Sequence, residues 1–160
     1  MTEPNRKLHL HLPAKDELDA RMYMLADPAT MSYNAAWGGT IAFPVSAWDD
    51  WYDYWIQHHE NQRYYRYVVN EDGIVVGEIA FHYDAKWGGY MANVLIHSRY
   101  RRRGYGREAL ALLCTAARSR GIPVLYDDMA IDNPAYGMFL EAGFVEIART
   151  DRIILLKKEL

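Results

Sequence analysis

Hydrophobic and polar residues alternate over several short stretches of this chain, starting with residues 8–12. Alternation is typical of strands with one buried face. Other stretches are rich in β-branched and aromatic residues, and the segments 71–73 and 87–89 between them read as hairpin turns. The predicted strands cover residues 8–12, 64–70, 74–83, 90–96, 124–131, 144–148 and 153–157.

Hydrophobic residues recur every three or four positions elsewhere, which predicts amphipathic helices. One helix follows Asp16 and carries Leu18, Met22 and Leu25 on one face. A second begins at a capping-box sequence, Ser46 to Asp49, and presents tryptophans along one side. Two more are predicted over 107–120 and 135–142, and the aperiodic segment 26–44 is predicted to be a long loop. The resulting order is β-α-α-β-β-β-α-β-α-β-β, an α/β or α+β fold with a mixed sheet.

The length and composition favour one globular unit, and we treat residues 1–160 as a single domain. Hydrophobic residues make up 51% of the chain, enough for a sizeable core. The single cysteine, Cys114, excludes an internal disulfide and a thiolate metal cluster, and no metal is expected. No stretch resembles a signal peptide or a membrane span, so we expect a cytoplasmic protein.

The run Arg101-Arg102-Arg103-Gly104-Tyr105-Gly106 lies between a predicted strand and a predicted helix. Its glycines allow a tight turn in which no Cβ blocks the backbone. The helix that follows directs unpaired N–H groups, and its positive end, at one point. Such a point favours a phosphate group. The sequence therefore predicts a pyrophosphate-binding turn.

The charge distribution supports one small anionic ligand. The chain carries a net charge of -3, yet five of its 18 basic residues are Arg99, Arg101, Arg102, Arg103 and Arg107. This leaves 18 − 5 = 13 basic residues against 21 acidic ones elsewhere. Nucleic acid needs an extended basic surface, so a nucleic-acid partner is not expected.

Three segments together resemble the GNAT superfamily of acetyl-CoA-dependent N-acetyltransferases. They are the strand end at 94–100 with its Arg-x-x-Gly-x-Gly loop, Asp132-Asn133-Pro134, and 139–144 with its Gly-Phe ending. A Rossmann site needs a further glycine after the first strand, and a Walker loop needs Gly-Lys-Ser/Thr. Both are absent. The resemblance implies a mixed, mostly antiparallel sheet of about seven strands flanked by about four helices.

The resemblance also implies how the acetyl donor, acetyl-CoA, is held. The backbone of the strand end would run beside the pantetheine arm, and the N–H groups after it would hold the pyrophosphate. The implied coenzyme-binding residues are Val94, Leu95, Ile96, Arg101, Arg102, Arg103, Gly104, Tyr105, Gly106, Arg107, Asn133 and Phe139. For Tyr105, an apolar packing role is the alternative.

Acetyl transfer to an amine needs a base, and some family members place a carboxylate on the strand after the glycine-loop helix. Asp127 and Asp128 lie there. Counting back from Gly143 selects Asp127, whereas counting from Asn133 selects Asp128; we favour Asp128 slightly. Adjacent residues face opposite sides of a strand, so we expect no more than one of the two in the cleft.

The residue at the position of the family's general acid differs from the family pattern. Many members carry a tyrosine four residues before the glycine of the Gly-Phe pair, and here that residue is Phe139. Tyr136 lies one turn earlier on the same helix and is our candidate substitute. Alternatively, no tyrosine acid is needed, since water can protonate a thiolate later.

The resemblance implies that the acceptor, a small-molecule or peptide amine, binds where the segment between the first strand and the second helix shapes the pocket. Tyr33 and Trp37, in the predicted loop, are candidates for the pocket wall, with Glu78. Glu78 and His82 are also second choices for the base. We expect no membrane partner, and the oligomeric state stays open, a homodimer being one option. Two other functions remain: a catalytically silent acyl-CoA-binding module, and an anion- or nucleotide-binding protein unrelated to CoA.

Overall fold

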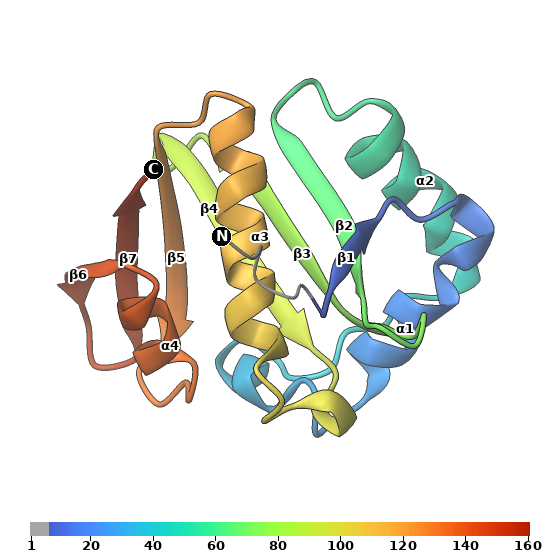
Figure 1. Cartoon of the computed structure of the whole chain (residues 1–160), viewed down its shortest axis with the longest axis horizontal. Coiled ribbons are helices and arrows are strands. Elements are labelled where there is room, and N and C mark those ends of the chain that lie inside the picture. Colours follow the sequence, from blue (N-terminus) through green and yellow to red (C-terminus); the bar gives the residue numbers. More distant parts are fainter. Residues whose placement is uncertain (1–6) are drawn as a thin grey trace, which may run out of the picture.

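The computed structural model describes residues 7–160, which form one seven-stranded sheet with helices on both faces (Figure 1). The strands are β1 (His9–His11), β2 (Arg63–Val69), β3 (Val75–Asp84), β4 (Gly89–Ile96), β5 (Val124–Ala130), β6 (Val145–Arg149) and β7 (Ile153–Glu159). The helices are α1 (Asp19–Ala26), α2 (Trp48–Tyr52), α3 (Tyr105–Ser119) and α4 (Tyr136–Glu141). The predicted element order and the mixed, mostly antiparallel sheet are confirmed.

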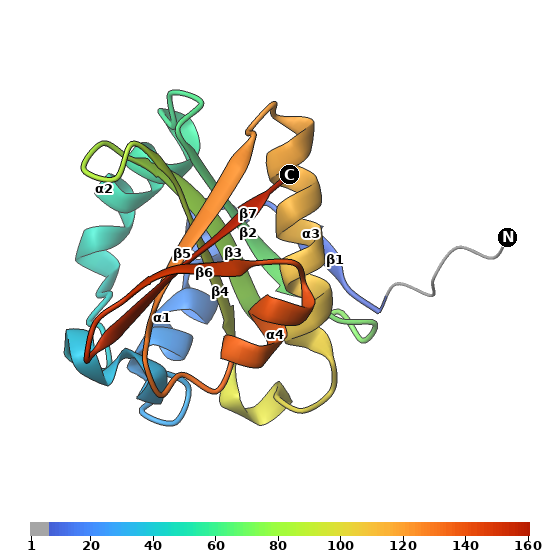
Figure 2. The same ribbon diagram turned by 90° about the vertical axis from the view of Figure 1, so that its left-hand side faces the viewer.

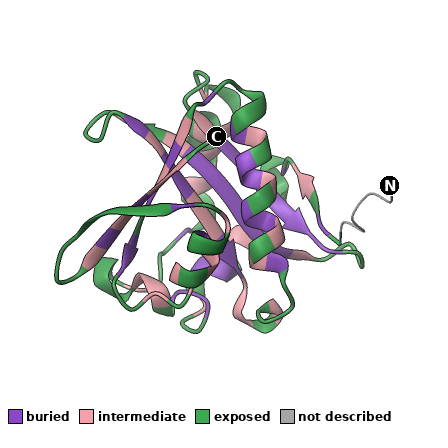
Figure 3. Cartoon of the chain, turned by 60° about the vertical axis from the view of Figure 1, so that its left-hand side comes forward, coloured by how far each residue is buried: buried purple, intermediate pink, exposed green. Residues whose placement is uncertain are grey.

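Helices cover the sheet from two sides, so the sheet lies between two apolar cores (Figure 2). α3 covers one face and buries Ala109, Leu110 and Leu113 completely. α1 and α2 cover the other, where Leu18 and Tyr65 are buried. Figure 3 shows this burial concentrated in the central strands and on the inner side of α3. No helix within residues 7–160 is long and apolar enough to cross a membrane.

The β2–β3 hairpin forms at the predicted turn, because Asn70 and Gly73 fix its geometry. The Asn70 side-chain oxygen accepts hydrogen bonds from the N–H groups of Asp72 and Ile74, each at 3.0 Å. Gly73 has a φ of +78°, a conformation that costs glycine little. β2 and β3 pair antiparallel from this turn to the opposite end of the hairpin, where Arg63 lies opposite His82.

Three local predictions need correction. Ser46 does not cap a helix with its side chain: it lies inside a 3-10 turn, Val45–Ala47, and α2 begins only at Trp48. The segment 26–44 is not all loop, since Ser32–Trp37 is a 3-10 helix. α3 starts two residues earlier than predicted, because Gly104, in a left-handed conformation, directly precedes its first turn.

The feature that makes room for a ligand is a gap between β4 and β5. These strands run parallel but pair only at Tyr90 with Leu125 and Met91 with Tyr126. Beyond this point β4 stays paired with β3, and β5 with β7, so the two halves of the sheet diverge. The divergence leaves a wedge that opens from Met91 toward Ile96 at the end of β4.

Candidate active site

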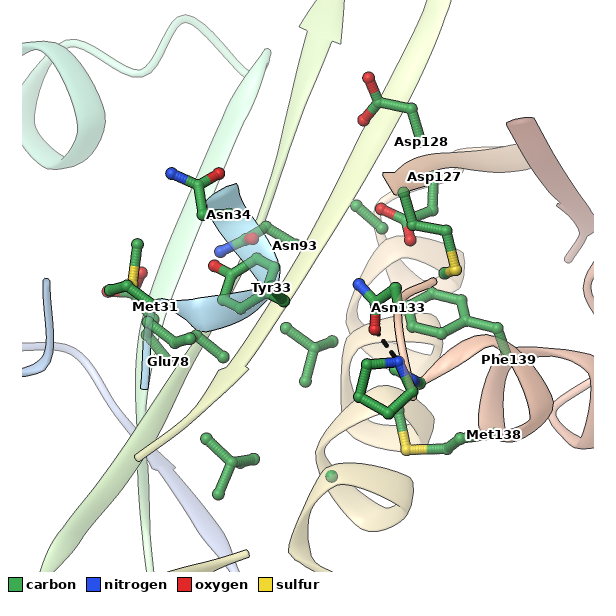
Figure 4. Close-up of a pocket in the computed structure, with 18 of the residues that line it drawn as sticks. Met31, Tyr33, Asn34, Glu78, Asn93, Asp127, Asp128, Asn133, Met138 and Phe139 are labelled. Carbon is green, nitrogen blue, oxygen red and sulfur yellow. Dashed lines mark hydrogen bonds between the residues drawn. The ribbon is translucent and has the colours of Figure 1, made fainter. Parts of the chain in front are cut away.

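A cavity of about 480 Å³ fills the wedge between β4 and β5 (Figure 4). Side chains reach it from both halves of the molecule. Tyr33 and Glu78 lie on one side, and Asp127, Asn133 and Phe139 lie on the other. The cavity therefore brings together the predicted pyrophosphate-binding turn (residues 101–106, called the glycine turn below), the edge of β4 and the predicted carboxylates.

The glycine turn has the geometry of an anion site. Gly104 has a φ of +81° and Arg102 a φ of +66°, which together turn the chain into α3. Within residues 7–160, no backbone or side-chain acceptor takes the N–H groups of Arg102 to Arg107. Gly106, in the first turn of α3, lines the cavity itself. These N–H groups and the positive end of a 15-residue helix favour a phosphate there.

The arginine side chains around this turn have separate tasks. Arg101 lines the cavity, but its guanidinium donates to the carbonyl groups of Ile96, Ala29 and Thr30 at 3.1, 3.2 and 2.6 Å. It therefore fixes the end of β4 to the segment before Tyr33, a role the sequence analysis did not predict.

The other charged side chains at the turn lie at the surface. Arg107 pairs with Glu141 at 2.7 Å, and Arg102 and Arg103 are exposed. Tyr105 is buried, which agrees with the packing role. The anion site thus consists of main-chain N–H groups more than of arginine side chains.

The edge of β4 offers backbone groups to the cavity. His97 donates its N–H to the Val76 carbonyl at 2.8 Å, which fixes the alternation along the β3–β4 ladder. In an antiparallel ladder, alternate residues direct both backbone groups away from the partner strand. His97 directs its backbone groups toward β3, so Val94, three residues earlier, directs both of its backbone groups away from β3. Since β5 has diverged there, the N–H and C=O of Val94 face the wedge.

Asp127 and Asp128 both line the cavity, contrary to the expectation that only one would. Their side chains leave β5 in different directions (Figure 4). Asp127 is only 8% exposed, whereas Asp128 is exposed. Asp127 directly follows the last β4–β5 pair, so it stands at the narrow end of the wedge. Burial, reinforced by the Asp128 charge, raises the pKa of the Asp127 carboxyl well above its usual range.

Asp127 is expected to make stability depend on pH. Its pKa is higher in the folded chain than in the unfolded one, so its contribution to stability is complete below about pH 4 and is lost as pH rises through the folded pKa. Asp127→Asn removes this loss. Urea unfolding between pH 4 and 8 should show the variant gaining on the wild type as pH rises. A constant difference would contradict the raised pKa of Asp127, and Asp132→Asn, at an exposed position, is the control.

α4 brings Phe139 to the cavity but not Tyr136. Phe139 lines it and packs against Phe144 at 5.0 Å between ring centroids. The Tyr136 ring lies beside the Arg149 guanidinium, 5.8 Å away, and Tyr136 is not among the cavity residues. The geometry gives no support to Tyr136 as the acid. Asn133 accepts from the Ala135 N–H at 2.8 Å, and this bond holds its amide at the cavity wall (Figure 4).

On the acceptor side, Glu78 is part of a buried ion pair. It is 2% exposed and receives both hydrogen bonds of the Arg21 Nη1 atom, at 2.8 and 2.7 Å. The Tyr65 hydroxyl also donates to it. Glu78 thus borders the cavity as a paired carboxylate. Tyr33 lines the same cavity, and burial raises its pKa to about 12. Trp37 lines it as well and is 46% exposed.

Comparison with known proteins identifies the family. Residues 22–144 match the model of the acetyltransferase (GNAT) family. The chain belongs to this family. The match confirms the resemblance predicted from the glycine loop and the predicted enzyme class, an acyltransferase. No curated protein matches the sequence significantly.

Solved structures share the GNAT fold at low sequence identity. YncA of Salmonella typhimurium, assigned as an acetyltransferase and solved with acetyl-CoA, is 18% identical with a TM-score of 0.75, over 97% of this chain and 95% of that one. Spermidine N-acetyltransferase of Vibrio cholerae, in complex with CoA and spermine, is 17% identical with a TM-score of 0.75, over 96% and 95%. Ribosomal-protein-alanine N-acetyltransferase of Brucella melitensis is 19% identical with a TM-score of 0.73, over 96% and 99%.

Several residues of this GNAT cavity escaped the sequence analysis, above all Arg21 and Asn93. Arg21 could have been found, because it lies three residues after Leu18 and four before Leu25, on the apolar side of the predicted helix. A cation on such a face needs a buried carboxylate. Asn93 interrupts the apolar strand 90–96 and offered a weaker signal.

Proposed function

We propose that this GNAT protein transfers an acetyl group from acetyl-CoA to a primary amine of a small molecule or peptide, by direct attack in a ternary complex. One observation carries the proposal: a single cavity in the wedge between β4 and β5 is lined both by Gly106, at the start of α3 where the N–H groups have no acceptor in the described chain, and by Asp127. A thioester whose diphosphate is held at the turn extends along β4 toward the carboxylates.

The residues present fit acetyl-CoA. The N–H groups of Arg102 to Arg107 hold the diphosphate, and the backbone of Val94 pairs with an amide of the pantetheine arm as an added strand would. Gly106 lines the cavity at the turn without adding a side chain to it. The fold shared with structures that contain acetyl-CoA or CoA supports the same placement.

Asp128 is the proposed base. Its carboxylate is exposed and has no hydrogen-bond or ion-pair partner in the described part of the chain, so it is free to accept a proton. An amine is mostly protonated at neutral pH and must lose a proton before it attacks. Asp128 takes that proton, directly or through water, while the amine nitrogen forms its bond to the acetyl carbon.

Asp127 is the proposed acid. The C–S bond breaks as the amide forms, and the leaving sulfur needs a proton. Phe139 cannot give one, and Tyr136 lies outside the cavity. Asp127 is buried at the narrow end of the wedge, and burial raises its pKa, which favours the protonated carboxyl that a general acid needs. Proton exchange through solvent returns Asp127 and Asp128 to their starting states.

Asp127→Asn is expected to lower kcat with acetyl-CoA by about 100-fold, because general acids contribute roughly 10²- to 10⁴-fold. Adding Phe139→Tyr to this variant places a hydroxyl at the usual family position and should recover a large part of the loss. Steady-state thiol release measures both. An unchanged kcat in Asp127→Asn, or a double variant as slow as the single one, would contradict the role.

A catalytically silent acyl-CoA-binding module is the second candidate function, and Phe139 in place of a tyrosine favours it. The two differ in turnover. Thiol release from acetyl-CoA, followed with a broad panel of primary amines, should exceed the acceptor-free rate for at least one amine. Tight acetyl-CoA binding in calorimetry, with no acceleration by any amine, would select the silent module.

A further inference from the structure

A second cavity, of about 400 Å³, adjoins the first on the side away from the glycine turn. The two share five residues, among them Asn93 and Asp128, so they meet at the proposed base. The residues that line only the second cavity are Trp51, Trp55, Tyr65, Ala80, His82, Asp84 and Met91. The sequence analysis named only His82 among them, as a second choice for the base, and the proposed reaction so far gives these residues no role.

The second cavity carries excess negative charge. Its carboxylates are Glu78, Asp84 and Asp128, and its one guanidinium, Arg21, is paired with Glu78. Asp84 and Asp128 form no ion pair within residues 7–160. Two unpaired carboxylates therefore face a shared space.

The remaining charged groups nearby do not cancel this excess. Burial lowers the pKa of His82, in spite of the opposing influence of Asp84 and Asp128, so its imidazole is neutral at neutral pH. Arg63, opposite His82 on β2, donates to the carbonyls of Tyr54 and His58 and does not line the cavity.

The walls suit an alkylammonium ion. The Arg21 guanidinium lies over the Trp51 ring, 4.7 Å from its centroid, and Trp51 stacks with Trp55 at 6.1 Å between centroids. Trp55, which meets His82 edge-on at 5.9 Å, is therefore the tryptophan of this wall that no guanidinium covers in the described part of the chain. The face of a tryptophan attracts cations, and its apolar surface accepts methylene groups. Aromatic walls with unpaired carboxylates are complementary to an organic cation and unfavourable for an anion.

We propose that the second cavity binds the distal ammonium group of an acceptor that carries two amines. Asp84 and the Trp55 ring hold the distal ammonium, while the other amine lies at Asp128, where the cavities meet. This inference rests on the proposed acetyl transfer for its orientation. The ligand class, an alkyl diamine, follows from the charge and walls of the cavity.

The test compares 1,4-diaminobutane with butylamine, two probes of equal carbon length that differ in the second ammonium. The wild type should show a KM for the diamine that is lower by about tenfold, the size of one partly buried ion pair. Asp84→Asn should remove this preference by raising the diamine KM, with little change for butylamine. Asparagine can still accept the N–H groups of Lys86 and Trp87, now bound by Asp84 at 2.9 and 3.3 Å, so the turn is preserved.

A matched control is Asp50→Asn, which removes an exposed carboxylate of α2 that does not line the cavity, and it should leave both KM values unchanged. Calorimetry of each amine without acetyl donor gives a readout independent of turnover. Tighter diamine binding that is lost in Asp84→Asn supports the cavity even if no acetyl transfer is found. Equal affinities of the wild type for the two amines, or an equal effect of Asp84→Asn on both, would overturn the proposal.

Discussion

Replacing Gly106 by valine is expected to weaken acetyl-CoA binding by at least about 100-fold while the protein stays folded. Gly106 is helical and lines the cavity, where a Cβ would come within 3.2 Å of the Met138 sulfur. The valine branches would occupy the space in which the diphosphate approaches the N–H groups of α3. Glycine and valine differ by only about half a kcal/mol in helix propensity, so the cost to folding is small. Calorimetry with acetyl-CoA and a thermal melt measure the two effects.

Two other glycines provide controls for this variant. A Cβ at Gly137, in α4, would meet no atom within 4 Å beyond the backbone of its own helix, and Gly137 does not line the cavity, so Gly137→Val should leave binding unchanged. Gly104→Ala should lose stability as well, because a φ of +81° costs an alanine about 1–2 kcal/mol. If Gly106→Val bound acetyl-CoA like the wild type, the diphosphate would have to lie elsewhere.

Asp128→Asn is expected to lower kcat/KM for a primary amine by about 100-fold at pH 7, because a positioned base contributes roughly 10²- to 10⁴-fold. The deficit should shrink as the pH approaches about 10, where an alkylamine loses its proton to solvent without help. Steady-state thiol release across this pH range measures the effect. Since the side chain is exposed and unpaired, the thermal melt should not move.

Asp132→Asn is the control for the base, as it removes an exposed carboxylate four residues along the chain that lines neither cavity. It should retain the wild-type rate at every pH. A deficit in Asp128→Asn that stays constant up to pH 10 would indicate a binding role for Asp128 in place of proton transfer.

The fold was predictable because its elements have local signals. Alternation along 74–83 and 90–96 reports strands with buried faces, and Gly73 marks the turn that joins the first hairpin. The glycine turn before α3 was also predictable, since its conformation depends on Gly104 and on the helix that follows. Boundaries were less accurate. Ser46 fits a capping motif, but it lies inside the 3-10 turn Val45–Ala47, so its side chain is not at the N-cap position of α2.

Side-chain partners from distant segments were not predictable from spacing. Arg101 belongs to a basic run beside a phosphate turn, yet it donates to carbonyls about 70 positions earlier. Glu78 resembled a free carboxylate of a strand until the structure placed Arg21 and Tyr65 against it. Alternation along β5 predicted that the side chains of Asp127 and Asp128 point to opposite faces of the sheet. It could not show that both line one cavity, because this depends on the divergence of β5 from β4.

A crystal structure of the protein with acetyl-CoA tests the central claim most directly. We predict the diphosphate within hydrogen-bond distance of the N–H groups between Arg102 and Arg107, the pantetheine arm beside Val94, and the sulfur near Asp127. A diphosphate bound away from α3, or an arm that leaves the wedge between β4 and β5 empty, would contradict the assignment.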